Sequence, residues 1–255
     1  MTLTLITACY NSAAVIRTAM ESVLRQAWPE IEYLVIDGGS TDGTVEIIRE
    51  YEPKFGGRMK WISERDQGLY DALNKGIRMS TGDVVGILNA DDFFAADDSV
   101  AHVAQVFFDS TVDCVFGDVR FVYATDLTRP VRYYSSKYFR PWLSRLGYLP
   151  AHPTFYCKRE LFEKNGCYHT DYRIAADHEL LIRFLVKAKM RYRYLSEVLV
   201  VMRMGGMSTR SVENTMILNR ENVRACRSNG IYTNRFMQLG KYLFKIPGLI
   251  FKTGY

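Results

Sequence analysis

The sequence predicts an α/β fold with a mostly parallel central sheet flanked by helices, and a helical extension at the C-terminus. Short apolar segments rich in β-branched residues alternate with amphipathic segments through residues 3–89. A cluster of polar residues follows each of the first four apolar segments. The contents of 48% apolar and 24% charged residues are typical of a soluble globular protein.

The first half of the chain alternates strands and helices in order. The predicted strands are residues 3–8, 31–37, 59–64 and 83–89, and the predicted helices are residues 11–26, 44–55 and 69–80. Asn11 or Ser12 is the expected N-cap of the first helix. Ligands bind outside the carboxyl ends of the strands in such sheets, so the four polar clusters should meet at one edge.

The second half is less regular. The predicted strands are residues 112–123, 132–136, 153–158, 191–195 and 198–204, and the predicted helices are residues 176–189, 212–228 and 235–251. The sequence contains no internal repeat and no Pro/Ser-rich linker. We therefore expect one domain over residues 1–210 and a C-terminal helical segment over residues 211–255.

Charge and cysteine content narrow the class of protein. The net charge of +5 suits an anionic partner. From residue 220 onward, Glu221 is the only acid among seven bases. The odd count of five cysteines matches no zinc pattern and indicates free thiols in a reducing cytosol. The start "MTLTLITACY" does not resemble a signal peptide and no apolar run is long enough to cross a bilayer, so we expect a cytoplasmic protein.

The stretch "VGILNADDFF" places two adjacent acids, Asp91 and Asp92, directly after a predicted strand. Mg²⁺ and Mn²⁺ are commonly held by one or two carboxylates together with substrate phosphates. The alternative is that one acid caps the next turn and the other is solvated. The position at the expected ligand edge favours a metal site.

Asp37 ends the second predicted strand in "VIDGGSTDG". An acid at this position can accept hydrogen bonds from a base or a ribose, although "DGGS" is also ordinary turn chemistry. The sequence has no GxGxxG and no GxxxxGK[ST] motif, which disfavours a dinucleotide-binding or P-loop protein.

Seven stretches together resemble the family 2 glycosyltransferases. They are "LITACYN", "EYLVIDGGSTDGT", "SERDQGLYDALNKGI", "TGDVVGILNADD", "AHPTFYCKRELFEKNG", "AADHELLIRFL" and "MGGMS". The resemblance implies the GT-A fold, a Rossmann-like α/β fold. It also implies a catalytic domain over residues 1–210, with the nucleotide-sugar side in residues 1–100 and the acceptor side in residues 101–210. The chain looks most like bacterial enzymes that build O-antigen, capsule or exopolysaccharide.

The resemblance implies roles on the donor side. The residues expected to contact the nucleotide sugar are Thr7, Ala8, Tyr10, Asp37, Asp66, Lys75, Asn89, Ala90 and Asp91. Thr7, Ala8 and Tyr10 would line the uracil and ribose pocket, and Asp37 would hold the base. Asp91 and Asp92 match the region that binds a metal–diphosphate, with Mn²⁺ or Mg²⁺ as the cofactor. Asn89 replaces the first acid of the family's DxD motif, so metal affinity should be modest.

On the acceptor side, the resemblance implies that Asp177 is the catalytic base of an inverting transfer. A carboxylate there would deprotonate the acceptor hydroxyl, and no covalent nucleophile is needed. The alternative role for Asp177 is a helix N-cap, which is compatible with catalysis. Glu179 is the other candidate base, but it should point away from Asp177. His152 would lie near the acceptor, although lone histidines are more often structural. His178 could approach the diphosphate.

The implied function is transfer of a hexose, with UDP as the expected nucleotide, to a polyprenyl-diphosphate-linked glycan; no nucleic acid partner is expected. The basic, apolar tail over residues 234–255 predicts either peripheral contact with the cytoplasmic face of the inner membrane or packing on the domain. Residues 204–209, "MGGMST", resemble a loop that closes over the donor, or form a plain turn. The rival functions are a sugar nucleotidyltransferase and a non-catalytic, membrane-associated nucleotide-binding protein.

Overall fold

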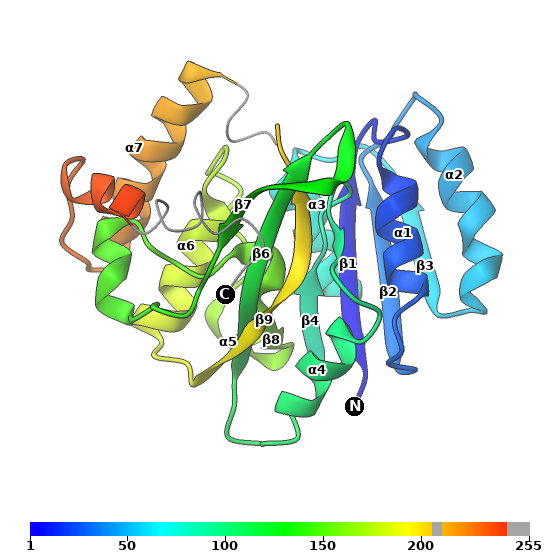
Figure 1. Cartoon of the computed structure of the whole chain (residues 1–255), viewed down its shortest axis with the longest axis horizontal. Coiled ribbons are helices and arrows are strands. Elements are labelled where there is room, and N and C mark those ends of the chain that lie inside the picture. The colour runs from blue at the N-terminus through cyan, green and yellow to red at the C-terminus, as the bar shows by residue number, and fades with distance from the viewer. Residues whose placement is uncertain (206–210, 244–255) are drawn as a thin grey trace.

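The computed structural model describes residues 1–205 and 211–243. It has a nine-stranded mixed sheet with helices on both faces (Figure 1). The strand order is β3-β2-β1-β4-β8-β6-β9-β5, and β7 pairs with β6 outside this path. This arrangement confirms the predicted α/β fold.

Four parallel strands form one half of the sheet and bring their carboxyl ends to one edge. They are β1 (Leu3–Cys9), β2 (Ile31–Asp37), β3 (Met59–Ser63) and β4 (Val84–Ile87). β1 lies between β2 and β4, and β3 lies beyond β2. Cys9 lies opposite Asp37, and Asp37 lies opposite Ser63, so these three strands end at the same level. The four polar clusters therefore begin at a common edge, as predicted.

The other half of the sheet is mixed. Its strands are β5 (Phe93–Phe94), β6 (Cys114–Tyr123), β7 (Asp126–Tyr134), β8 (Tyr156–Lys158) and β9 (Tyr192–Arg203). β8 is antiparallel to β4 and to β6, whereas β9 is parallel to β6. The prediction of two strands at 191–195 and 198–204 is wrong, because β9 runs through both. Register shifts next to Asp118 on β6 absorb the irregularity that the sequence suggested was a break.

Most predicted helices are present. The helices are α1 (Ile16–Leu24), α2 (Thr44–Tyr51), α3 (Leu69–Met79), α4 (Ser99–Val106), α5 (Glu160–Asn165), α6 (Ala176–Ile182) and α7 (Val212–Ser228). Short 3₁₀ segments are η1 (Glu52–Phe55), η2 (Pro141–Leu146), η3 (His152–Thr154) and η6 (Met237–Gly240), and η4 (Arg183–Lys187) is a π-helical turn. The predicted N-cap at Asn11 or Ser12 is wrong, because α1 is preceded by Val15.

Alternate residues of β1 and β2 point into two separate cores, one on each face of the sheet. Leu5 and Tyr33 pack in one core with α1, α2 and α4. Ile6 and Leu34 pack in the other with α3 and α6. This alternation follows from the period of two along a strand and leaves the sheet covered on both faces.

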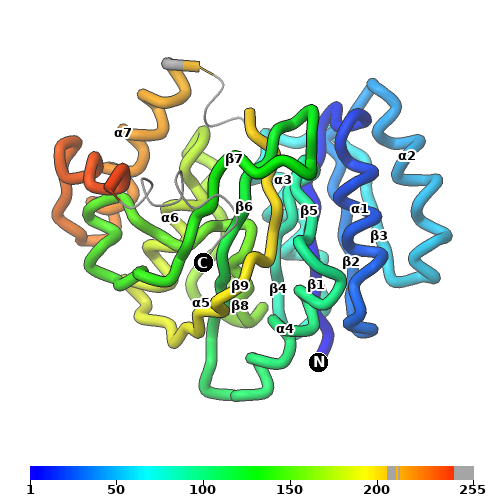
Figure 2. Tube along the Cα trace, viewed as in Figure 1, coloured from blue at the N-terminus to red at the C-terminus, as the bar shows by residue number. Residues whose placement is uncertain are grey.

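The C-terminal part of the chain packs beside α6, on the side of the molecule away from β3 (Figure 2). Ala225 and Cys226 of α7 are fully buried in the core that contains α6. The predicted helix at 235–251 is described only to residue 243, and most of the predicted loop at 204–209 also lies outside the described residues. Within residues 1–205 and 211–243, no helix combines the length and apolar composition that a bilayer span requires.

Candidate active site

The loops after β1 and β2 are bonded to each other at the carboxyl edge of the sheet. The Asn11 N–H donates to Ser40 Oγ at 2.8 Å, and Asn11 Oδ1 accepts from the Thr41 N–H at 2.9 Å. The Ser12 N–H donates to Thr44 Oγ1 at 2.8 Å. Asn11 has a φ of 48°, a left-handed conformation that asparagine tolerates. These bonds hold Asn11 and Ser12 in the loop, which is why neither caps α1.

Asp37 is fully buried beneath the platform formed by the loops after β1 and β2. Its carboxylate accepts hydrogen bonds from the Gly39 and Ser40 N–H groups, from Ser40 Oγ at 2.5 Å and from Ser63 Oγ at 2.6 Å. Burial by itself would raise the pKa of Asp37, but the hydrogen bonds from Ser40, Ser63 and Gly39 outweigh it and lower that pKa. Asp37 is thus an ionised carboxylate that fixes the floor of the predicted base pocket.

Asp66 lies directly over Gly38. A Cβ atom on Gly38 would be 2.5 Å from Asp66 Oδ2, so glycine is needed for the carboxylate to occupy this place. Asp66 Oδ1 also accepts the Gly68 N–H at 2.8 Å. Lys75 Nζ forms an ion pair with Glu64 at 2.8 Å, in the loop that carries Asp66. The loops after β2 and β3 therefore meet at the Asp66–Gly38 contact, with Lys75 supporting it.

Replacing Gly38 with alanine is expected to lower UDP affinity about tenfold with little change in thermal stability. The added methyl group displaces the Asp66 carboxylate, which is expected to contact the nucleotide. Loss of one charge-assisted hydrogen bond from that carboxylate costs about 1.5–3 kcal/mol. Titration calorimetry with UDP measures the effect. The double variant G38A/D66A should bind UDP as D66A does; additive losses would show that Gly38 acts without Asp66.

Thr7, Ala8 and Tyr10 lie at the end of β1 but differ in exposure. Thr7 is fully buried, and its hydroxyl donates to the Leu88 carbonyl at 2.8 Å, which ties β1 to the end of β4. Ala8 is also buried, whereas Tyr10 is 63% exposed. Of the three, Tyr10 has the side chain that a nucleotide could reach directly.

The turn after β4 holds its two acids in different environments. Asp92 is 1% exposed, and its Oδ2 accepts the Asn89 Nδ2–H at 2.8 Å. Burial, followed by the negative charge of Asp91, raises the pKa of Asp92 well above its usual range. Asp91 is half-buried, and its backbone carbonyl accepts from Arg203 Nη1 at 2.7 Å. Asn89 and Ala90 complete the turn, and Ala90 is buried.

The donor atoms of this turn fit a divalent cation that is shared with substrate phosphates. No hydrogen bond or ion pair within the described residues engages the Asp91 carboxylate, so its oxygens are available. Residues 1–205 and 211–243 contain no group of three or more His, Cys, Asp and Glu side chains that could hold a metal alone. Mg²⁺ characteristically accepts one or two carboxylates and completes its shell with phosphate and water oxygens.

Asp177 lies in the first turn of α6 and is half-buried. It is not the N-cap, which is Ala175. The Tyr70 hydroxyl, at the start of α3, donates to the Ile174 carbonyl just before α6. Since α3 follows the loop after β3, this bond places Asp177 at the carboxyl edge. Burial raises the pKa of Asp177, and the nearby His152 opposes this shift only when its imidazole is protonated.

Glu221 of α7 anchors the segment that leads into α6. Its carboxylate accepts three backbone N–H groups, those of Arg173 at 2.8 Å, Ile174 at 2.9 Å and Ala175 at 2.9 Å. N–H groups at the start of a helix have no partner within the helix, and Glu221 supplies one for these three groups just before α6. A side chain from the C-terminal helix therefore positions the predicted base.

His152 belongs to a network of buried polar and aromatic groups near Asp177. Its Nε2 lies 2.6 Å from the Tyr168 hydroxyl, and the Tyr168 ring stacks on Tyr70 with 5.7 Å between centroids. The Asn74 side chain bonds both backbone groups of Tyr168, at 2.8 and 2.9 Å. Burial lowers the pKa of His152, so the imidazole is neutral near pH 7. His152 therefore lies close enough to Asp177 for the two groups to interact electrostatically, and its role at the acceptor stays a prediction.

His178 and Glu179 face the C-terminal segment. Burial lowers the pKa of His178 to about 3, and the positive charge of Lys241 adds to the shift. Among the residues that the structure describes, the buried Nε2 of His178 has no hydrogen-bond partner. Glu179 is 1% exposed and forms a two-pronged ion pair with Arg183 at 2.9–3.2 Å. Glu179 is therefore committed to a structural pair, and Asp177 is the carboxylate of this turn open to an acceptor.

Sequence reasoning missed Tyr70, Tyr168, Arg203 and Glu221 as site residues. Arg203 ends β9, holds Asp91 and donates from Nη2 to Thr18 Oγ1 at 2.9 Å. Glu221 carried one signal, since it is the only acid in a basic segment. The other three stand in stretches whose spacing carries no signal for this site.

Comparison with known proteins now adds to this geometry. Residues 4–176 match the family model described as "Glycosyl transferase family 2". A relative from Mycobacterium bovis, "PGL/p-HBAD biosynthesis glycosyltransferase", is 31% identical over 211 residues, which cover 81% of this chain and 79% of the relative. The chain belongs to glycosyltransferase family 2. The matched region of this family 2 glycosyltransferase contains all four loops of the carboxyl edge and ends one residue before Asp177.

Solved structures confirm the GT-A fold of this family 2 glycosyltransferase. Staphylococcus aureus TarS 1-349 in complex with UDP-GlcNAc superposes with a TM-score of 0.68 at 18% identity, covering 88% of this chain and 66% of that one. The mannosyltransferase PcManGT from Pyrobaculum calidifontis, in complex with GDP-Man and Mn²⁺, gives 0.66 at 21% identity, with coverage of 95% and 69%. This chain spans 39% of a longer TarS chain.

Proposed function

We propose that this family 2 glycosyltransferase transfers a hexose from a UDP-linked sugar, with inversion, to a lipid-linked glycan during bacterial surface polysaccharide assembly. The observation that carries the proposal is the half-buried Asp177 on the sheet edge that also holds Asp37, Asp66 and Asp91. A base and a set of nucleotide-binding acids on one edge suit a reaction between an acceptor hydroxyl and a nucleotide sugar.

The donor side is proposed to use the platform between β1, β2 and β3. Tyr10 is exposed at its rim, Asp37 fixes its floor and Asp66 lies over Gly38. The oxygens of the Asp66 side chain can accept hydrogen bonds from the N–H of a uracil ring or from a ribose hydroxyl. The structures of TarS with UDP and with UDP-GlcNAc support a uridine donor by analogy of fold.

The acceptor step is proposed to use Asp177 as general base. Its carboxylate takes the proton from the acceptor hydroxyl while that oxygen bonds to the anomeric carbon, and the bond from this carbon to the diphosphate oxygen breaks. Departure from the opposite face inverts the anomeric configuration. The burial that raises the pKa of Asp177 makes it a stronger proton acceptor than an exposed aspartate. His152 lies beside it and orients the acceptor.

Asp91 is proposed to hold Mn²⁺ or Mg²⁺, with Asp92 and Asn89 bracing the turn from within. The cation, when bound, supplies positive charge that stabilises the departing diphosphate. The binding of GDP-Man with Mn²⁺ by PcManGT supports a metal of this type. Arg203, which bonds to the Asp91 carbonyl, holds the turn in place.

A panel of nucleotide sugars tests the proposal without knowledge of the acceptor. We expect slow UDP release from one UDP-hexose in the presence of Mn²⁺, loss of that release with a chelator, and thermal stabilisation by UDP. GDP-mannose and UDP-N-acetylglucosamine serve as comparison donors.

Two results would contradict it. Pyrophosphate release from UTP and a sugar phosphate would indicate a nucleotidyltransferase. Absence of hydrolysis with every donor, despite UDP binding, would favour the non-catalytic nucleotide-binding alternative.

A further inference from the structure

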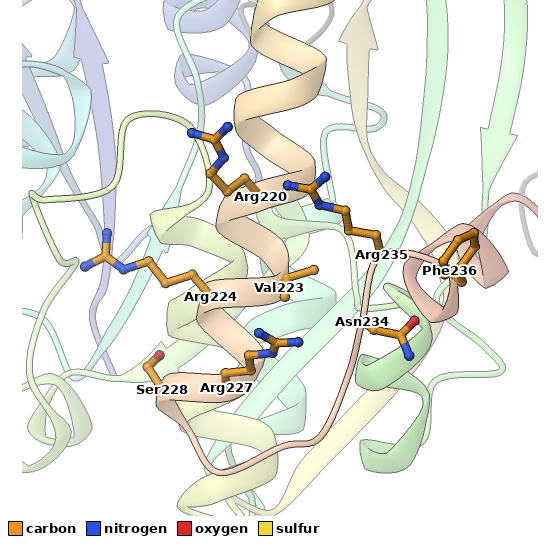
Figure 3. Close-up of a pocket in the computed structure, with 8 residues that line it drawn as sticks. All are labelled: Arg220, Val223, Arg224, Arg227, Ser228, Asn234, Arg235 and Phe236. Atoms are coloured by element: carbon orange, nitrogen blue, oxygen red, sulfur yellow. The ribbon is translucent and has the colours of Figure 1, made fainter.

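A cleft of about 670 Å³ lies between α7 and the segment that follows it, on the side of the molecule away from β1–β3 (Figures 1 and 3). Arg220, Arg224 and Arg227 line it from α7, and Asn234, Arg235 and Phe236 line it from the segment opposite. The three α7 arginines are spaced by four and three residues, which places them on one face of the helix. Four arginines therefore line the cleft, although the Arg224 side chain extends away from Arg235, toward Asp171 (Figure 3).

These arginines are mostly without anionic partners. Arg224 pairs with Asp171. Arg227 donates to the Thr233 carbonyl at 3.2–3.3 Å and forms no ion pair with another described residue. Within the described residues, neither Arg220 nor Arg235 forms an ion pair. Arginines that lie close together without counter-charges repel one another, and a bound anion relieves this repulsion. Guanidinium groups match the geometry of phosphate oxygens, so the cleft suits a phosphate group.

Large apolar side chains are exposed on the same C-terminal part of the chain, and one of them, Phe236, lines the cleft. Phe236 is 84% exposed, Tyr232 is 71% exposed and Leu243 is 70% exposed. Met216 lies four residues before Arg220 on the same face of α7 and is also exposed. A soluble anion would be bound by the arginines alone and gives no reason for exposed apolar groups beside them. A phospholipid surface presents phosphate groups to the arginines and hydrocarbon to the apolar side chains, so it accounts for both.

We propose that the arginine cleft, with the exposed Phe236 in its lining, binds the phosphate headgroups of anionic phospholipids and docks the protein on a membrane surface. Arg220 and Arg235 contact the headgroup phosphate, while Phe236 enters the boundary between headgroups and acyl chains. The inference rests on the proposed function in one respect: a lipid-linked acceptor is the reason for the protein to dock on a membrane. Its test needs neither sugar donor nor acceptor, so the two can fail separately.

Co-sedimentation of the full chain with vesicles tests the docking. We expect binding to mixed phosphatidylcholine–phosphatidylglycerol vesicles, weaker binding at high salt, and little binding to phosphatidylcholine alone. The double variant R220Q/R235Q should lose about 25-fold in affinity, since each basic residue near an anionic surface contributes about fivefold. F236S should weaken binding at high salt, where the apolar contact carries more of the affinity.

The matched control is R49Q/R78Q, which removes two exposed arginines on α2 and α3 that form no ion pair within the described residues. It should bind as the unaltered protein does. Equal binding to neutral and anionic vesicles, or unchanged binding of R220Q/R235Q, would overturn the proposal. Thermal stabilisation by inorganic phosphate without vesicle binding would assign the cleft to a soluble anion and would also overturn it.

Discussion

Replacing Asp177 with asparagine is expected to abolish sugar transfer while UDP binding stays intact. The amide cannot accept the acceptor's proton, and a positioned general base typically contributes about 10²–10⁴-fold in rate. Asp177 lies on α6, whereas the proposed UDP contacts lie after β1, β2 and β3, so nucleotide affinity should not depend on it. Transfer from the best donor of the panel measures the first effect, and calorimetry with UDP measures the second.

The pH dependence gives an independent check of the same residue. Burial raises the pKa of Asp177, and the active form is the ionised one. The rate should therefore rise with pH through that pKa and then level off. The midpoint of the rise should lie at a higher pH than the pKa of an exposed aspartate. D171N, which alters an exposed carboxylate six residues away, should leave both rate and profile unchanged. Turnover by D177N near the wild-type rate would remove Asp177 from the chemistry.

Replacing Asp91 with alanine is expected to remove most of the gain in UDP affinity that Mn²⁺ provides. Loss of an outer-sphere partner already costs roughly 10–100-fold in metal affinity, and loss of a direct ligand should cost at least as much. UDP binding without metal should change little, because the base and ribose contacts lie on other loops. Calorimetry with and without Mn²⁺ separates the metal-dependent part of the UDP affinity from the metal-independent part.

The neighbouring acid provides the matched control for Asp91. Asp92 is buried against Asn89, and asparagine has the same shape, so D92N should retain most of the Mn²⁺-dependent gain. If D92N loses the gain and D91A keeps it, the ligand is Asp92, and the turn must open to bind metal. Equal losses in both would indicate that the two carboxylates act together.

Much of the donor half could be predicted from the sequence because its signals are local. Each strand from β1 to β4 is a short apolar run, each is followed by polar residues, and parallel pairing brings those ends to one edge. The positions of Asp37, Asp66 and Asp91 at that edge follow directly. The predicted Asp177 role depended instead on family resemblance, since one acid before an apolar helix is also typical of a cap.

The rest depends on contacts between distant segments. Asn11 and Ser12 resemble helix caps, but their bonds to the loop after β2 take them out of that role. β9 crosses a polar stretch that resembles a break, because a register shift beside Asp118 accommodates it. Tyr70 and Ile174 are 104 residues apart, and their bond cannot be read from spacing.

Glu221 of α7 accepts three hydrogen bonds from the segment before α6, so the C-terminal helical segment and the domain before it are not interchangeable modules. A shortened protein ending at residue 210 would retain every loop of the matched family region and yet lose the side chain that holds the segment before Asp177, the proposed base. A chimaera that joins these loops to a foreign tail would need an acid at the same turn of the incoming helix.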